Sequence, residues 1–302
     1  MSKVKEKSPL QDGNDFFLHI VFILGTVLCL VPMSLILIIS LTTESEIVNN
    51  GYTFFPGEVT LDTYKYLFNN FGVILTGYKN TLITMVVGTV LKLFCVGLYA
   101  YVLARKDFPY RGFFSVLVLI TMLFSGGLGP GYYFMTKIYK LKNTLTALIF
   151  SGLGMGFQVF MVKSYYMSNI PFELIESAKI DGAGETRTFF QIVAPMAIPI
   201  FSTIALMTSI GYWNAFQPCL LYIEKESLYT IQYSMQRALQ NVNAVKNMME
   251  AGIAGAEEDL ANMPSEGIRM GMAVFAIGPI VLAYPFFQKF FLKGMTVGAV
   301  KG

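Results

Sequence analysis

Long apolar runs are the feature that most constrains how this chain can fold. Six segments are long enough to cross a hydrocarbon layer about 30 Å thick as helices, at about 1.5 Å per residue. Lipid offers the backbone no hydrogen-bond partners, and no alternating strands of about ten residues occur, so helices are predicted. The prediction is an all-α polytopic membrane protein with six transmembrane helices. They cover residues 16–41, 78–103, 112–131, 143–166, 190–213 and 268–292.

Composition supports a membrane protein over a soluble one. Of the 302 residues, 14% are charged and 54% are hydrophobic, whereas a soluble domain has about 25% charged residues. Cys29, Cys95 and Cys219 lie in or beside apolar runs at no metal-ligand spacing, so we expect core packing rather than disulfides or ligands. The net charge of +3 comes without a dense Lys/Arg cluster, so nothing indicates binding to nucleic acid.

The distribution of basic residues predicts the orientation. Lys3, Lys5 and Lys7 precede the first apolar run, which is too long for a signal-peptide core and is expected to be a retained span. With the N-terminus inside, Lys and Arg are concentrated in short inner segments, as the positive-inside rule requires. The outer loop 137–142, with three lysines, argues against this orientation. The overall bias predicts that both termini are cytoplasmic.

Two outer segments are long enough to hold structure of their own. Residues 42–77 contain turn signals and a predicted short amphipathic helix over Leu61–Phe68. Residues 219–267 are expected to form an outer loop with one or two helices outside the membrane.

Glycine and proline interrupt the last three spans. One interpretation is that small residues allow close helix packing, and the other is that the breaks allow kinks around a cavity that opens and closes. Both interpretations stay open. The residues are Gly152, Gly154, Gly156, Pro195, Pro199, Gly211, Gly278, Pro279 and Pro285.

A charged insert, "IESAKIDGAGETRTFFQIVAPM", opens onto the fifth apolar run. Pro171 is suited to a first helical turn, so a helix is predicted over Phe172–Asp181, ending where Gly182 allows a sharp turn. A second short helix is expected to run from Gly184 into the fifth span and to bend at Pro195. The prediction is a helix–glycine–helix elbow on the inner face.

The elbow, residues 168–189, carries an apolar stripe at helical spacing. Ile175, Ala178 and Phe172 form this stripe, which we expect to be exposed and suited to docking into a groove of another protein. The alternative is an amphipathic connector that rests on lipid headgroups.

The spacing within the insert is specific. It resembles the EAA loop of permease subunits of binding-protein-dependent ABC importers, in which EAA is followed by three residues, G, nine residues and I-x-L-P. Ser177 and Ala194 are the two departures from that pattern, and both are conservative. The matching positions are Glu176, Ser177, Ala178, Gly182, Ile192 and Pro195.

The resemblance extends over nearly the whole chain. The stretch Asn80–Phe114, the segment "GYWNAFQPCLLYI" and the terminal "YPFFQKFFLKGMTVGAVKG" are similar to carbohydrate-uptake permeases, within the LplC-type polysaccharide and oligosaccharide branch. Residues 241–267 match least well.

This resemblance implies a type I ABC importer-like transmembrane domain in the bacterial cytoplasmic membrane. The implied partners are a second homologous permease subunit, two ATP-binding subunits and an extracytoplasmic solute-binding lipoprotein. The elbow would be the coupling helix that docks on an ATPase subunit, with Glu176, Ser177, Ala178, Gly182, Ile192 and Pro195 at that interface.

The chain itself has no signature of catalysis. It has no G-x-x-x-x-G-K-[ST] loop, and His19 is its only histidine, so a His-based triad or His-rich metal site is not available. We therefore expect a non-catalytic subunit without its own cofactor, with ATP and Mg²⁺ bound by the partner ATPase.

The substrate path is sought at the outer end of the fifth span. Tyr212, Trp213, Asn214 and Gln217 cluster there, and aromatic faces stack on sugars while amides bind hydroxyls. An aromatic belt at the membrane interface explains the two aromatic residues equally well.

Lys92 is the one cation near the middle of a predicted span. It is expected either to face a cavity or partner, or to snorkel or pair with a carbonyl.

The function predicted from the sequence is one transmembrane subunit of an ABC importer for an oligosaccharide or polysaccharide. An alternative within this class is import of a peptide or polyamine. A self-sufficient secondary carrier would need repeated halves or intramembrane carboxylates for ion coupling, and neither occurs in the six spans.

Overall fold

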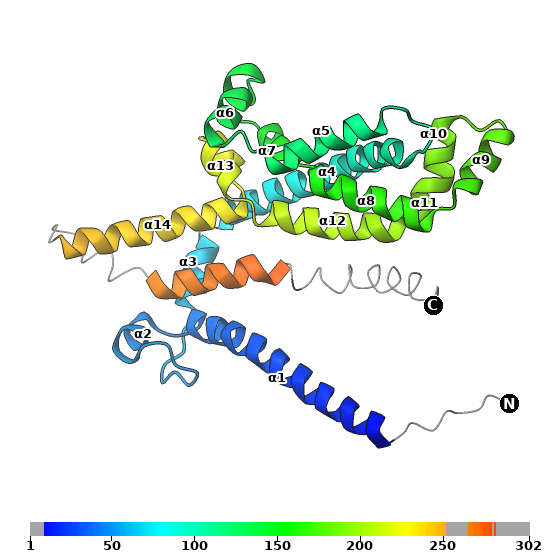
Figure 1. The fold of residues 1–302 in the computed structure, drawn as a ribbon. Coiled ribbons are helices and arrows are strands. Elements are labelled where there is room, and N and C mark those ends of the chain that lie inside the picture. The colour runs from blue at the N-terminus through cyan, green and yellow to red at the C-terminus, as the bar shows by residue number, and fades with distance from the viewer. Residues whose placement is uncertain (1–8, 70, 252–264, 280, 282–302) are drawn as a thin grey trace. The chain divides into compact units, whose positions relative to one another are not determined.

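The computed structural model of the chain describes residues 9–69, 71–251, 265–279 and 281. Within these residues every regular element is a helix, apart from one isolated bridge between Thr42 and Val59, so the all-α prediction is confirmed (Figure 1). The chain divides into two compact units. The first comprises Met1–Asn70 and Leu239–Gly278, and the second Phe71–Ala238 and Pro279–Gly302.

The first unit begins with the long helix α1 (Pro9–Ser40), which covers the first predicted span. Its apolar side chains between Phe16 and Leu37 are largely exposed, as expected of a surface that meets lipid or a membrane partner. Short helices α2 (Glu44–Asn50) and α3 (Asp62–Asn69) follow, and α3 confirms the helix expected over Leu61–Phe68.

Helices α2 and α3 pack against a helix over residues 265–279. The Glu44 carboxylate accepts hydrogen bonds from Ser265 Oγ at 2.6 Å and from the backbone N–H of Glu266 at 3.1 Å, so it caps the start of that helix. Further along, Gly271 faces the side chains of Thr63 and Leu67 so closely that a Cβ would not fit. A carboxylate cap and a close glycine contact therefore hold this part of the first unit together.

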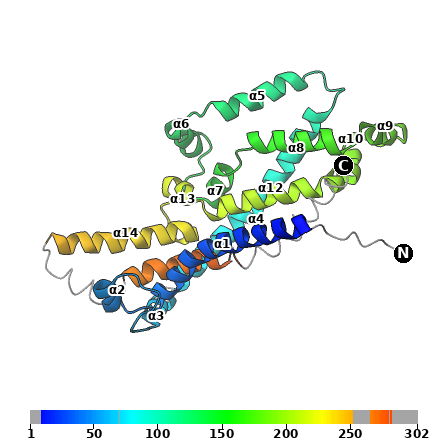
Figure 2. The ribbon, with the colours of Figure 1, turned by 60° about the horizontal axis from the view of Figure 1, so that its bottom comes forward.

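Helix α4 (Phe71–Ala104) is the centre of the second unit. It packs against α8 (Gly156–Asn169) and α12 (Ile198–Trp213), and Figures 1 and 2 both place α5 (Arg111–Leu123) on the side of α8 opposite to α12. Val96, Ala100, Val159, Val162 and Ile204 are almost fully buried at these contacts. Small and branched side chains bring the helix backbones close together, which is how helices associate in a membrane.

Three of the predicted spans are broken in the structure. The segment expected over 112–131 is α5 followed, after a bend of 107°, by α6 (Leu128–Tyr133) and the π-helical turn η1 (Phe134–Ile138). The segment expected over 143–166 is α7 (Leu145–Ser151) and α8, bent by 56°.

The fifth segment, expected over 190–213, is broken as well. It bends by 78° at Ala197, between Pro195 and Pro199. Among the residues that the structure describes, α1 and α4 can each cross a membrane by length and composition, and up to five spans result if each bent pair is one span. The sixth predicted span, 268–292, lies partly outside the described residues.

Beyond α12 the chain forms α13 (Gln217–Tyr222), the 3₁₀ turn η3 (Glu226–Leu228) and α14 (Ile231–Glu250). Except for the first two residues of α13, these elements fall within the predicted outer loop 219–267, which was expected to contain one or two helices. Cys219 and Tyr222 belong to a second buried cluster here, while Cys95 is half-buried and Cys29 is exposed, so only Cys219 is fully buried as expected.

Candidate functional site

The first arm of the elbow is helix α9 (Phe172–Ile180), which begins after Pro171 as predicted. Gly182 has φ +78°, in the left-handed region that favours glycine. Its N–H bonds to the Lys179 carbonyl at 3.0 Å, and the N–H of Ala183 bonds to the Ala178 carbonyl at 2.9 Å. These two bonds make a Schellman motif, so the glycine stop predicted from the sequence is confirmed.

The second arm leads from Gly184 into α12. It consists of α10 (Glu185–Thr188), the π-helical turn η2 (Phe189–Val193) and α11 (Ala194–Met196). Figure 1 shows α9 beside α10, at the end of the second unit away from α13.

The apolar stripe of α9 is not exposed, which corrects the expectation from the sequence. Ile175 and Ala178 are each only 7% exposed, and Ile175 belongs to the core around α4, α8 and η2. The stripe therefore holds the elbow to its own chain. The large apolar side chains that the first arm exposes are Leu174 and Ile180, at 42% and 86%.

A groove of about 350 Å³ separates the two arms. It contains three of the six residues carried over from the EAA pattern, Ser177, Ala178 and Ile192. Glu176 is exposed, and no hydrogen bond or ion pair joins its carboxylate to another described residue. Gly182 and Pro195 are also exposed. The lining residues are Leu174, Ser177, Ala178, Asp181, Ala183, Arg187, Gln191 and Ile192.

A charged network, which the sequence did not predict, ties both arms to the end of α4. The Arg105 guanidinium donates to both carboxylate oxygens of Asp107, at 2.8 and 2.6 Å, and to Glu185 of the second arm at 2.7 Å. Nζ of Lys179, in the first arm, lies 2.9 Å from Oδ2 of Asp107 and 3.4 Å from Oε1 of Glu185. The hydroxyl of Tyr101 donates to Glu185 and accepts from Arg105, both at 2.8 Å.

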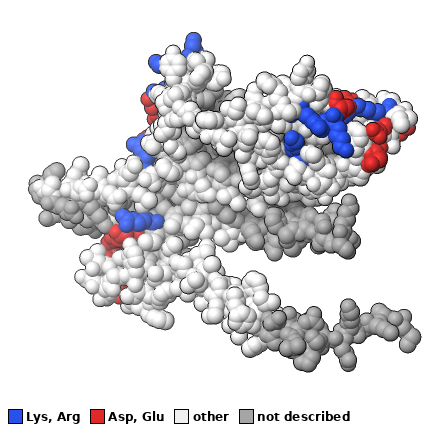
Figure 3. Space-filling view, in the orientation of Figure 1, with Lys and Arg blue, Asp and Glu red and all other residues white. Residues whose placement is uncertain are grey.

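Hydrogen bonding keeps this network ionised. Bonds from Arg105 and then Lys179 hold the pKa of the Asp107 carboxyl far below its ordinary 3.8, and Asp107 raises the pKa of Lys179 above its ordinary 10.5. A depressed acid pKa stabilises the folded state above pH 3.8, and a raised lysine pKa stabilises it below pH 10.5. Figure 3 shows basic and acidic atoms gathered over this end of α9 and α10.

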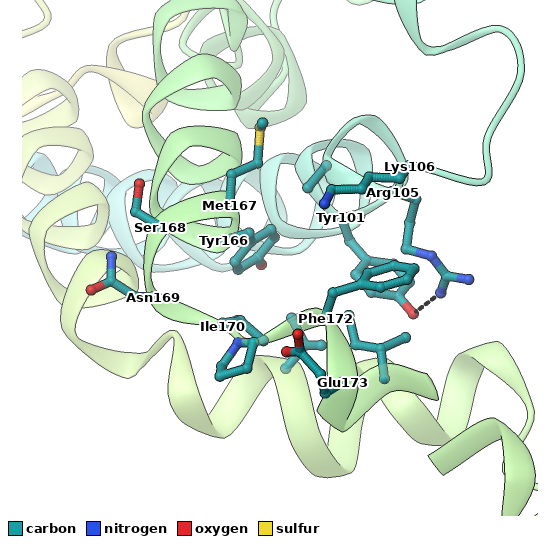
Figure 4. Close-up of a pocket in the computed structure, with 14 residues that line it drawn as sticks. Tyr101, Arg105, Lys106, Tyr166, Met167, Ser168, Asn169, Ile170, Phe172 and Glu173 are labelled. Carbon is teal, nitrogen blue, oxygen red and sulfur yellow. Dashed lines mark hydrogen bonds between the residues drawn. The ribbon is translucent and has the colours of Figure 1, made fainter. Parts of the chain in front are cut away.

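A pocket of about 330 Å³ lies beside the network, between the ends of α4 and α8 and the start of α9. Figure 4 shows Tyr101 and Arg105 beside Phe172, with Ser168 and Asn169 at the opposite side. Lys106 lies over the Phe172 ring at 5.7 Å. Sequence reasoning missed this pocket, because its walls come from three separate segments.

The four residues proposed for a substrate path differ in exposure. Tyr212 and Trp213 are each 5% exposed, whereas Asn214 and Gln217 are exposed. The Tyr212 hydroxyl donates to the Ile149 carbonyl at 2.6 Å, so this side chain joins α12 to α7. Burial favours packing for the two aromatic residues, and a role in a substrate path stays a prediction.

Lys92 pairs with a carbonyl, which was one of the alternatives left open. Its Nζ donates to the Gly152 carbonyl at 3.2 Å, at the break between α7 and α8. An ammonium group there complements the negative end of the α7 dipole and a carbonyl without a helical partner.

Comparisons with known proteins match the chain over nearly its whole length. Residues 95–297 match the family model described as "Binding-protein-dependent transport system inner membrane component". Protein LplC of Bacillus subtilis is 34% identical over 304 aligned positions, which cover 100% of both chains. The polygalacturonan/rhamnogalacturonan transport system permease protein YtcP of the same organism is 31% identical, covering 95% of this chain and 98% of YtcP.

The fold also matches a solved structure. A chain in the crystal structure of a bacterial ABC transporter, involved in the import of the acidic polysaccharide alginate, aligns with a TM-score of 0.78. The alignment covers 94% of this chain and 99% of that chain, at 21% identity, so the likeness concerns the fold.

Proposed function

The chain belongs to the family of binding-protein-dependent transport system inner membrane components, and we propose that it is a permease subunit of an ABC importer for a carbohydrate. The observation that carries this proposal is the similarity, over nine tenths or more of each chain, to permeases named for polysaccharide and oligosaccharide transport, together with an elbow that has the EAA spacing. The names of these relatives favour a polysaccharide or oligosaccharide over a peptide or polyamine. Membership of this family argues against a self-sufficient secondary carrier.

The elbow is the part of the chain that would couple transport to ATP hydrolysis. Its groove and the exposed Leu174 and Ile180 provide a surface on which an ATPase subunit can dock. Glu176 is exposed without a partner among the described residues, so its carboxylate can accept a charge-assisted bond from a basic residue of the ATPase. The Schellman turn at Gly182 fixes the angle between the two arms.

The assembly proposed is that of a type I importer. It would contain a second permease subunit, two ATPase subunits that bind ATP and Mg²⁺, and an extracytoplasmic solute-binding lipoprotein. The present chain would contribute six spans, with both termini in the cytoplasm, and no catalytic residue.

Isolation of the complex tests this function directly. The tagged chain, expressed in its own cell, is purified in mild detergent, and co-purifying proteins are identified by mass spectrometry. We expect an ATPase and a second multi-span protein, and ATP hydrolysis stimulated by members of a panel of neutral and uronate oligosaccharides. A chain that purifies alone as a stable, monodisperse protein would contradict the proposal.

The substrate path gives a prediction of its own. If Asn214 and Gln217 bind sugar hydroxyls, replacing both with alanine should raise the sugar concentration for half-maximal uptake about thirtyfold, since each neutral hydrogen bond contributes about 1 kcal/mol. ATP consumed per sugar should stay unchanged. Asn50→Ala, at an exposed polar site in α2, is the control. An unchanged half-maximal concentration in the double variant would exclude these amides from the path.

A further inference from the structure

The charged network at the base of the elbow joins both arms to the residues that follow α4. Docking on an ATPase does not by itself require such a connection. We propose that Arg105, with Asp107 and Glu185, is a second mechanical link that connects the elbow to α4, in addition to its covalent connection to α12. When the ATPase moves the elbow, α4 and α12 then move together. This inference rests on the proposed function. It assigns Arg105 the role of a positioning residue in energy coupling.

The covalent route from the elbow into the membrane domain is bent. From α10 the chain passes through the π-helical turn η2 and then turns by 78° at Ala197 before α12 begins. A force applied to the elbow therefore reaches α12 through a path with a bend and an irregular turn. Helix α4, in contrast, is continuous from Phe71 to Ala104 and packs against α7, α8 and α12.

Arg105 lies where a force on the elbow can enter α4. It follows the last residue of that helix, its side chain is only 7% exposed, and its guanidinium holds Asp107 with two parallel bonds. The same guanidinium holds Glu185, 80 positions further along the chain. A planar fork that bonds two carboxylates at once fixes orientation as well as distance, which a lysine cannot do.

Lys179 connects the first arm of the elbow to the same network. It belongs to α9, while Glu185 belongs to α10, and Lys179 contacts both Asp107 and Glu185. Both arms are therefore held by the residues that directly follow α4. Movement of either arm relative to α4 has to break at least one charged contact.

The fold does not depend on these charges alone. Ile175 and Phe189 bury apolar side chains against the same region, and the Tyr101 and Phe189 rings contact each other at 5.4 Å. Asp107 and Glu185 are about half exposed, and ion pairs at such sites contribute little net stability. Neutralising one member should therefore leave the chain folded but loosen the elbow.

The experiment uses the complete importer in proteoliposomes and the oligosaccharide of the panel that stimulates ATP hydrolysis most. Two rates are measured, ATP hydrolysis and oligosaccharide uptake. For Arg105→Gln we expect assembly and hydrolysis to persist while uptake per ATP falls about tenfold, within the 5–150-fold range typical of coupling free energies. For Arg105→Lys the uptake per ATP should lie between that of Arg105→Gln and that of the unmodified chain, because lysine keeps the charge but lacks the planar guanidinium.

Arg111→Gln is the matched control, because Arg111 is a neighbouring basic residue with no ion pair among the described residues. Its uptake per ATP should equal that of the unmodified chain. If Arg105→Gln does not assemble, Glu185→Gln decides, since it cuts the link to the second arm but leaves the Arg105–Asp107 pair. An unchanged ratio in whichever variant assembles would overturn the link. Failure of the unmodified chain to assemble with an ATPase would instead overturn the proposed function.

Discussion

Replacing Gly182 with valine is expected to abolish ATP-driven uptake while the chain still inserts into the membrane. At φ +78° a β-branched residue is strained by about 1–2 kcal/mol or more. Relief of that strain would break the two Schellman bonds, made by the N–H groups of Gly182 and Ala183. The arms would then lose their fixed angle, although the spans would be unchanged. The measurement is uptake and oligosaccharide-stimulated ATP hydrolysis in the reconstituted importer.

Two controls separate backbone conformation from side-chain size. Gly182→Asn should keep most of the activity, because asparagine tolerates the left-handed region. Gly184→Ala adds a methyl group at an ordinary φ of −69°, where nothing lies within 4 Å of the new Cβ, and it should be neutral. Normal stimulated hydrolysis and uptake in Gly182→Val would show that the turn does not set the coupling.

Reversing the charge of Glu176 is a companion test at the same surface. Glu176→Lys should leave the fold intact, because no other described residue bonds to this carboxylate. It should weaken docking of the ATPase about tenfold or more if the carboxylate meets a basic residue, since a charge-assisted bond contributes about 1.5–3 kcal/mol. Co-purification of the ATPase with each variant measures this effect. Equal recovery from Glu176→Lys and the unmodified chain would contradict the docking role.

The elbow could be predicted from sequence because its signals are local. Pro171 and Gly182 delimit α9 through backbone preferences that act within a few residues of the helix ends. The long apolar segments likewise predicted helices, since hydropathy over a window is a local property. Average hydropathy did not reveal that three of these segments are interrupted. The few residues between Leu123 and Leu128, or Ala197 alone, change the average little, although the helix is broken there.

The charged base of the elbow could not be predicted in the same way. Arg105 and Glu185 are brought together by the packing of α4 against the elbow, and no spacing rule relates positions so far apart. The apolar stripe was wrongly predicted to be exposed for a similar reason. Helical periodicity shows that Ile175 and Ala178 share a face of α9, but only the tertiary structure shows what covers that face.

A second large effect is expected at the Tyr212 ring, which lies between a glycine of α4 and a glycine in the turn that follows α7. A Cβ at Gly88 of α4 or at Gly152 after α7 would lie well inside 3.0 Å of that ring. The hydroxyl is also fixed by the Ile149 carbonyl, so the ring cannot shift freely. Gly88→Ala and Gly152→Ala should each destabilise the folded chain by about 1–3 kcal/mol, the range for overpacked cores. Thermal unfolding in detergent measures the loss.

Removing the ring distinguishes a steric effect from a backbone effect. In a Tyr212→Leu background the methyl group of Gly152→Ala has space, so the second substitution should cost almost nothing, and the double-mutant cycle should show coupling of about 1–3 kcal/mol. Gly211→Ala, beside Tyr212 with nothing within 4 Å of its Cβ, should be neutral or stabilising. Equal losses with and without the Tyr212 ring would mean that Gly152 is required by its backbone. In that case the breaks in the spans would reflect flexibility at glycine more than close packing of helices.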